Sequence, residues 1–233
     1  MIGAVSNDLD RSFALGKGKE FVLEGDEYDT AFFDKESKFL HYRPHTVLWT
    51  SLEFDHADIF PSMERLELMF RKLLAKIPAD GELIYCRDWK RVHEMVEEER
   101  ESSLRDKTIV SYGFSPESQI KIENFIENAQ GIQFQVLGES FSMSMPGKFN
   151  AQNATAALIA AKRGGVSFEI LKSELANFKG LKRRQEVRIE KNGTRVIDDF
   201  AHHPTAVKQV LEALRAKYPD TRIVAFFEAR SNT

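Results

Sequence analysis

The sequence has little cysteine, no excess of basic charge and no long apolar run. Cys86 is the single cysteine among 233 residues, so no internal disulfide can form, as is usual in a reducing compartment. A formal net charge of -3 offers no basic surface for nucleic acid or an anionic membrane. No apolar run is long enough to span a bilayer, and the first residues lack a leader pattern. We therefore expect a cytoplasmic protein that binds neither nucleic acid nor membrane.

A phosphate-binding loop of the P-loop type is also missing. Such a loop needs a glycine, four residues and then Gly-Lys-Ser/Thr at the start of a helix. The nearest stretch, Gly16-Lys17-Gly18-Lys19, is followed by Glu20 and an apolar run instead. These 233 residues therefore lack a complete cradle for a nucleoside triphosphate.

What the sequence does contain is a regular alternation of apolar runs and helical periodicity. Runs typical of strands lie at 46–52, 81–86 and 107–113, and helical segments begin at Pro61 and span about 88–101. This order predicts an α/β fold with a mostly parallel sheet flanked by helices. Within the second helix, we expect the acidic cluster 97–99 to be a solvated face.

Two of the apolar runs end in acidic residues. We predict that 21–23 forms a short buried strand and that 46–52 forms a second one. The carboxylates and the imidazole that follow them are Glu24, Asp26, Glu27, Asp29, Glu53, Asp55, His56 and Asp58. Ligands bind beyond the carboxyl ends of strands in open α/β sheets, and hard oxygen donors there suit Mg²⁺. A solvated acidic turn is the alternative for the first cluster.

The next segment changes periodicity. Alternation at 132–136 and 141–145 predicts an antiparallel pair, which an Ala-rich helix over about 151–163 follows. Asn150 and Asn153 lie three residues apart at its start, where amides either pair with a base edge or cap the helix. Taken alone, Asn150 is more typical of a cap. A further helix is expected from Ser167 to Phe178.

A new unit is predicted to begin after residue 182. A hairpin at 187–197, a helix from Pro204 to Lys217 and a strand at 222–227 are expected there. The strand-to-helix switch carries Asp198, Asp199, His202 and His203, a usual ligand position. So few elements bury too little for a complete domain. We therefore expect one domain over 1–182 and the truncated start of a Rossmann-like domain over 183–233.

Six motifs occur in the order found in Mur ligases, a family that the chain resembles along nearly its whole length. They are Glu24-Gly-Asp-Glu-Tyr-Asp29, Glu53-Phe-Asp-His56, Gly147-Lys-Phe-Asn-Ala-Gln-Asn153, Arg184 before Glu186, Asp198-Asp-Phe-Ala-His-His-Pro204 and Glu228-Ala-Arg-Ser-Asn-Thr233. Stretches 29–35, 39–45 and 52–60 look most like the members that join UDP-N-acetylmuramate to the recycled tripeptide L-alanyl-γ-D-glutamyl-meso-diaminopimelate with ATP.

The resemblance implies a role for each matching residue. Glu24 and His56 match the ligands of Mg²⁺, and Asn150 and Asn153 match the helix that holds the adenine of ATP. The nucleotide-contacting arginine is matched by Arg184. The catalytic pair of the third-domain motif is matched by Asp199 and His202, and Asp198, His203 and Arg230 are further nucleotide-binding candidates. The implied reaction passes through an acyl phosphate, formed when the muramoyl carboxylate attacks the γ-phosphate and then consumed by the peptide amine.

Three departures from the family pattern limit this transfer. The P-loop and the sugar-binding domain of the family precede the position of Met1, so we expect a fragment that is inactive alone. Neither Arg71 nor Lys72 is a convincing counterpart of the lysine that several members carbamylate. Phe149 and Ala229 stand where histidine and proline are expected. The alternatives are a UDP-N-acetylmuramate:L-alanine ligase and a non-catalytic binding module that keeps the fold.

Overall fold

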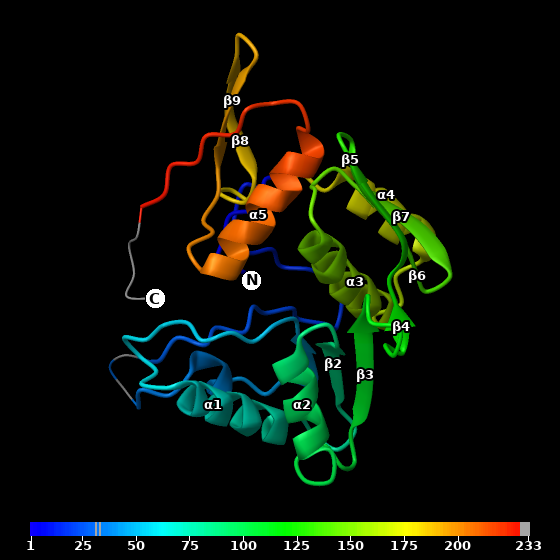
Figure 1. Ribbon diagram of the computed structural model, residues 1–233. Helices are drawn as coiled ribbons and strands as arrows, with labels where there is room; N and C mark the ends of the chain where they lie inside the picture. The colour runs from blue at the N-terminus through cyan, green and yellow to red at the C-terminus, as the bar shows by residue number, and fades with distance from the viewer. Residues whose placement is uncertain (31, 33, 229–233) are drawn as a thin grey trace. The chain divides into compact units, whose positions relative to one another are not determined.

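The computed structural model describes residues 1–30, 32 and 34–228, which form two compact units (Figure 1). The sheet unit comprises Gly25–Glu123 and Gln152–Ile159. The hairpin unit comprises Met1–Glu24, Asn124–Ala151 and residues 160–228. It includes residues on both sides of position 182, and the domain boundary predicted there stays a prediction. No helix in the described ranges is long and apolar enough to cross a membrane.

The sheet unit is built on four parallel strands. Their order is β1 (Thr46–Trp49), β2 (Glu82–Cys86), β3 (Thr108–Gly113) and β4 (Ile120–Lys121). Leu83 lies opposite Val47 on one side and Ile109 on the other. All but the first residue of β2 are buried, as expected for a central strand with both faces covered. The predicted mostly parallel α/β sheet is confirmed.

Two helices pack in this unit, α1 (Met63–Lys76) and α2 (Lys90–Glu99). The first begins at Met63 rather than at Pro61, because Ser62 caps it and accepts a hydrogen bond from the Arg65 N–H at 3.4 Å. Phe70 of α1 stacks on Trp49 of β1, with ring centroids 4.8 Å apart. The short helix η1 (Lys38–His41) adds Phe39 to the same core.

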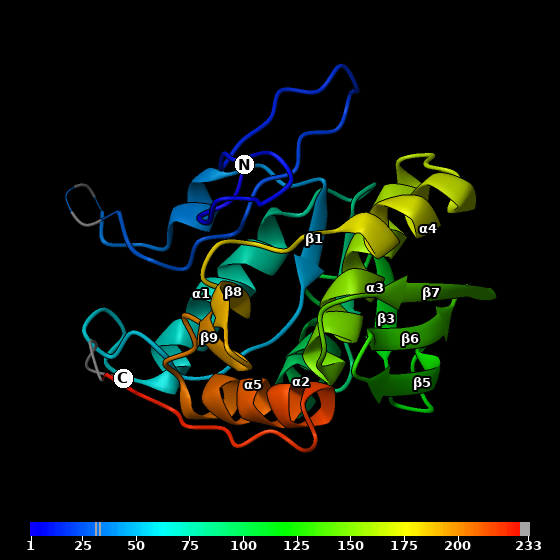
Figure 2. The same ribbon diagram turned by 90° about the horizontal axis from the view of Figure 1, so that it is seen from above.

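The hairpin unit contains a three-stranded sheet in the order β5 (Glu123–Asn128), β6 (Gly131–Val136) and β7 (Glu139–Met143), which Figure 2 shows side by side. The antiparallel pairing of β6 with β7 is as predicted, with Phe134 opposite Phe141. Helix α4 (Phe168–Asn177) packs against β7.

The remaining elements follow the predicted order closely. Helix α3 (Lys148–Arg163) follows β7 along the chain. Strands β8 (Glu186–Lys191) and β9 (Thr194–Asp198) form the predicted antiparallel hairpin. Helix α5 (Pro204–Lys217) begins and ends at the predicted residues, because a proline in the first turn loses no helical hydrogen bond.

Two predicted strands are wrong. Residues 21–23 and 222–227 belong to no strand, and Phe21 and Phe226 are 68% and 97% exposed. A strand needs a neighbour to pair its backbone N–H and C=O groups. The first segment makes only irregular contacts with the N-terminus, such as Glu24 N–H to the Met1 carbonyl at 3.0 Å. The β-forming side chains of both segments therefore produced a false signal.

Candidate functional site

His56 is held in a fixed position after β1. It is 8% exposed and has a φ of 59°, a left-handed conformation that is strained for a residue with a side chain. Its Nε2 atom lies 3.0 Å from Oε1 of Glu27, and its ring centroid lies 4.1 Å from that of Tyr28. The Asp55 carboxylate accepts the His56 backbone N–H at 2.7 Å. Neighbouring residues therefore fix both the backbone and the ring of this histidine.

The surroundings of His56 carry a negative potential. Burial first, and then the carboxylates of Asp58, Asp55, Glu27 and Asp26, raise the pKa of the Tyr28 phenol above its ordinary value. A group of carboxylates that disfavours a phenolate favours a cation. The His56 imidazole offers a donor nitrogen of the kind a divalent cation accepts, and the Glu27 contact orients its ring. Such a nitrogen suits an ion that takes its other ligands from carboxylate, phosphate and water.

Glu24, the second predicted metal ligand, belongs to the hairpin unit, whereas His56 belongs to the sheet unit. The Glu24 carboxylate accepts the Gly3 N–H at 2.5 Å. Among the residues that the structure describes, no group of three or more His, Cys, Asp or Glu side chains is arranged to hold a metal ion. The pairing of Glu24 with His56 therefore stays a prediction. Glu27, which sequence reasoning left unassigned, is the carboxylate in contact with the imidazole.

The start of α3 gives Asn150 a different role from the cap expected of it. Gly147 is the N-cap residue, with φ at 112°, and its N–H donates to Glu127 Oε1 at 2.6 Å. Asn150 is the third residue of the helix and is 7% exposed. Its Nδ2 atom donates to the Pro146 carbonyl at 2.6 Å. Since a cap needs a side-chain oxygen that accepts a backbone N–H, the capping interpretation is wrong.

Asp88 joins the strand ends of the sheet unit to α3. Its carboxylate accepts the N–H groups of Phe114 at 2.8 Å and Ser115 at 2.7 Å, and the Gln152 amide at 2.7 Å. Asp88 follows β2, Phe114 follows β3, and Gln152 lies between Asn150 and Asn153 on α3. A Cβ on Gly113 would lie 2.6 Å from the Asp88 carboxylate, so only glycine fits there. The exposed Asn153 is thus carried by a helix anchored at the ligand-binding edge of a parallel sheet.

Asp199 joins the motif after β9 to the segment before β8. One carboxylate oxygen accepts the Gln185 N–H at 2.8 Å, and the other accepts the Ala201 N–H at 2.7 Å. The Phe200 N–H donates to the Arg183 carbonyl at 2.9 Å. In this arrangement Asp199 stabilises backbone, and its catalytic role stays a prediction.

The Phe200 ring contacts two guanidinium groups and one imidazole of the same region, that of His202. The guanidinium groups of Arg183 and Arg184 lie 4.8 and 5.6 Å from its ring centroid. The Nδ1 atom of His202 lies 2.9 Å from the Phe200 carbonyl oxygen. His203 is the N-cap residue of α5 but makes no capping hydrogen bond through its side chain. The structure thus brings Arg184 and His202 to one aromatic ring.

The remaining predicted positions have these locations. Asp198 ends β9, with a carboxylate oxygen 3.8 Å from Nε of Arg183. Arg230 lies outside the described residues. Lys72 forms an ion pair with Glu36, and Arg71 forms ion pairs with Glu98 and Glu99. The absence of a counterpart to the carbamylated lysine stays a prediction.

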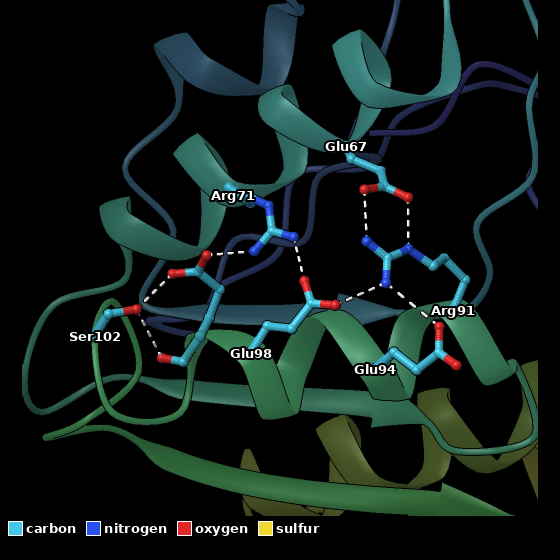
Figure 3. Close-up of polar contacts among 7 residues, drawn as sticks. Glu67, Arg71, Arg91, Glu94, Glu98 and Ser102 are labelled. Carbon is cyan, nitrogen blue, oxygen red and sulfur yellow. Dashed lines mark hydrogen bonds and ion pairs between the residues drawn. The ribbon is translucent and has the colours of Figure 1, made fainter.

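In the acidic cluster of α2, Glu97 and Glu98 are exposed as expected from sequence, while Glu98 and Glu99 also take part in an interhelical network (Figure 3). Arg91 of α2 binds both carboxylate oxygens of Glu67 on α1, at 2.5 and 2.6 Å. The same guanidinium binds Glu98 at 2.8 Å. Burial would raise the pKa of Glu99, but hydrogen bonds from Ser102 and Arg71 lower it to about 2. Glu98 and Glu99 therefore join the two helices.

A cavity of about 690 Å³ lies within the hairpin unit beside Asp198 and Asp199. Its walls are β9, α5 and residues 221–227, and most of the lining side chains are aliphatic or aromatic. The wrongly predicted strand at 222–227 therefore forms one wall of a cavity. An apolar lining of this kind does not match a triphosphate, which needs amide and cationic donors.

Comparison with known proteins places the chain in a family. Residues 9–161 match the Mur ligase middle domain, and residues 183–232 match the Mur ligase glutamate ligase domain. The UDP-N-acetylmuramate–L-alanyl-γ-D-glutamyl-meso-2,6-diaminoheptandioate ligase of Escherichia coli K12 is 37% identical over 100% of this chain and 50% of that protein. The UDP-N-acetylmuramate–L-alanine ligase of Chlorobium phaeobacteroides BS1 is 31% identical over 98% of this chain and 48% of that protein.

Solved structures agree with these relatives. The murein peptide ligase of Psychrobacter arcticus 273-4 has a TM-score of 0.65 and 31% identity, over 97% of this chain and 47% of that chain. The chain spans about half the length of the curated relatives that it matches. With the motifs, the parallel sheet and both domain matches in agreement, the chain belongs to the Mur ligase family.

Proposed function

We propose that the chain works in an ATP- and Mg²⁺-dependent ligase that joins UDP-N-acetylmuramate to L-alanyl-γ-D-glutamyl-meso-diaminopimelate. The observation that carries this proposal is the 37% identity with the Escherichia coli ligase of that name over the whole chain. The alanine ligase of Chlorobium phaeobacteroides BS1 is 31% identical over a similar span. The single buried cysteine and the nucleotide substrates favour a cytoplasmic site for the reaction.

The residues around His56 would bind the metal ion in this reaction. Glu24 and His56 are the proposed ligands, and Glu27 would orient the imidazole through its 3.0 Å contact. When bound, Mg²⁺ supplies positive charge that stabilises the transferring phosphoryl group. The negative potential that raises the pKa of Tyr28 supports a cation at this place.

The start of α3 and the Asp199 region would bind the nucleotide and the reacting groups. Asn150 and Asn153 would hold the adenine, and Arg184 would contact the ribose or phosphate. His202 and Asp199 would act on the carboxylate and the phosphoryl group, and Asp198, His203 and Arg230 are further candidates for binding the nucleotide. Cationic and hydrogen-bonding groups at these positions would lower the barrier by stabilising charge on the phosphoryl group.

A chimera tests which acceptor is used. Residues 1–233 replace the matching half of the Escherichia coli ligase, and the chimera receives ATP, Mg²⁺, UDP-N-acetylmuramate and equal amounts of tripeptide and L-alanine. Mass spectrometry should show the tripeptide adduct as the main product, formed only with ATP. Accumulation of the L-alanine adduct would identify an alanine ligase instead. Absence of both adducts from a folded chimera would favour the non-catalytic module.

A further inference from the structure

Gln185 carries a buried polar atom that the reaction described above does not use. Its side-chain Nε2 atom is buried and has no hydrogen-bond partner in the described part of the chain. The backbone of Gln185 has a φ of 49°, and Arg183 two residues earlier has a φ of 60°. A buried donor without an acceptor and a strained backbone both destabilise folding, so such a site is commonly kept for function.

The other end of the Gln185 amide contacts Asn150. Oε1 of Gln185 lies 3.4 Å from Nδ2 of Asn150, which also donates to the Pro146 carbonyl at 2.6 Å. Both acceptors therefore engage the nitrogen of the Asn150 amide. Its oxygen makes no hydrogen bond to any residue that the structure describes. The two contacts thus set the orientation of the Asn150 amide, and its side-chain oxygen can accept a hydrogen bond from a ligand.

Gln185 is also held through its main chain by the motif that follows β9. Its backbone N–H donates to Asp199 Oδ2 at 2.8 Å, and Asp199 also accepts the Ala201 N–H. A continuous path of contacts therefore runs from Asp199 through Gln185 to Asn150. All three residues belong to the hairpin unit.

We propose that Gln185 is a positioning residue that sets base specificity by fixing the Asn150 amide with its oxygen as the acceptor. This inference rests on the proposed function, in which Asn150 holds the base. An amide oxygen accepts from the 6-amino group of adenine. The 6-oxo group of hypoxanthine presents a second acceptor at that position, and two acceptors repel each other. Without Gln185, the amide nitrogen keeps its bond to the Pro146 carbonyl but loses its second acceptor, so the amide is held less firmly and discriminates less between the two bases.

The test compares ADP with IDP, its hypoxanthine analogue, by ligand-observed NMR at millimolar concentration, which suits weak binding. Wild-type chain should bind ADP about tenfold more tightly than IDP, the ratio expected for one well-placed hydrogen bond. Gln185→Met keeps the side-chain volume but removes the amide, and the preference should fall to about twofold. Gln133→Met, at an exposed position on β6, should keep the wild-type ratio.

Thermal unfolding separates positioning from a purely structural role. Gln185→Met should leave the melting temperature unchanged or raise it, because it removes a buried donor that has no partner. A variant that keeps the ADP preference would overturn the inference and leave the proposed function standing. A lowered melting temperature with an unchanged preference would assign Gln185 a structural role only. Failure of the chimera, which regains the P-loop half of the family, to bind either nucleotide would overturn the proposed adenine site and the inference with it.

Discussion

Glu27 Oε1 lies 3.0 Å from Nε2 of His56, and this contact defines the geometry of the acidic turn. We predict that Glu27→Gln weakens binding of Mn²⁺, a paramagnetic substitute for Mg²⁺, by about tenfold, because a carboxylate orients and polarises a ligand imidazole better than an amide does. Broadening of the His56 ring signals by Mn²⁺ measures this. Glu174→Gln, at an exposed position on α4, removes the same charge and should have no effect. Equal broadening in both variants would contradict the role of Glu27.

The interhelical network should make the free energy of unfolding depend on pH in the acidic range. The pKa of Glu99 is about 2 in the folded chain, below its ordinary value of 4.5. A lowered folded pKa means that the stabilisation is complete above about pH 4.5 and is lost as the pH falls towards 2. Glu99 should contribute on the order of 2 kcal/mol after screening, since its side chain is 14% exposed.

Urea unfolding at several pH values measures this contribution. The wild-type free energy of unfolding should fall between pH 5 and pH 3, and the Glu99→Gln variant should show a smaller fall. Glu174→Gln again serves as the matched control. Parallel pH profiles for wild type and Glu99→Gln would show that the network does not stabilise the folded chain.

The glycine at the end of β3 should tolerate no side chain. Gly113→Ala places a methyl group 2.6 Å from the Asp88 carboxylate at a φ of 146°, so it should cost about 2 kcal/mol or more of unfolding free energy. Gly25→Ala is the matched control, because a methyl group there meets no atom within 4 Å. Chemical denaturation of both variants measures the difference. Equal midpoints would mean that Asp88 does not require the glycine.

A protease should cut at the predicted domain boundary. Lys182, Arg183 and Arg184 are exposed and lie between α4 and β8. We expect brief trypsin treatment to cleave after one of them before any other site, with the cut identified by mass spectrometry of the two pieces. Replacing all three residues with glutamine should abolish this early cut. Cleavage that begins elsewhere would argue against a boundary at this point.

Sequence reasoning succeeded where the signal is local. The helix from Pro204 to Lys217 has a proline in its first turn and clear periodicity, and both of its ends were predicted. Strands β1, β2 and β3 were predicted because each is a short apolar run, whereas β4, of two residues, and the mostly polar β5 were missed. Periodicity also gave the antiparallel pairing of β6 with β7.

Prediction from the sequence failed where a segment's structure depends on residues far away in the chain. Residues 21–23 and 222–227 have β-forming side chains, yet a strand also needs a neighbouring strand. Spacing could not show that Glu98 and Glu99 face Arg71 of another helix.

The sequence predicted which kinds of residue make up the candidate site better than it predicted which of them are in contact. The acidic turn and His56 were proposed as a site because polar residues follow apolar runs, and their role in metal binding stays a prediction. The sequence gives no sign that Glu27 is the carboxylate beside the imidazole, because four acids lie within six residues there. Asp88 was not predicted as a site residue because an aspartate after a strand is common. Only the fold brings Phe114, Ser115 and Gln152 into contact with it.

Comparing turnover with thermal stability in a His56 variant shows whether His56 acts in the reaction or only in folding. In the chimera, His56→Ala should lower turnover at least about a hundredfold, since it removes a proposed ligand of the ion that stabilises phosphoryl transfer. It should lower the melting temperature by only a few degrees, because alanine keeps the same left-handed backbone and the change removes only the ring's contacts with Glu27 and Tyr28. A proportional loss of folding and activity would point to a structural histidine.

Product formation by the chimera and by residues 1–233 alone tests the central claim most directly. The chain carries the predicted metal, adenine and carboxylate-activating residues, but its sequence holds no P-loop for the triphosphate. With ATP, Mg²⁺, UDP-N-acetylmuramate and the tripeptide, mass spectrometry should detect the ligated product from the chimera and none above background from residues 1–233. Efficient ligation by residues 1–233, or none by a folded chimera, would contradict the account.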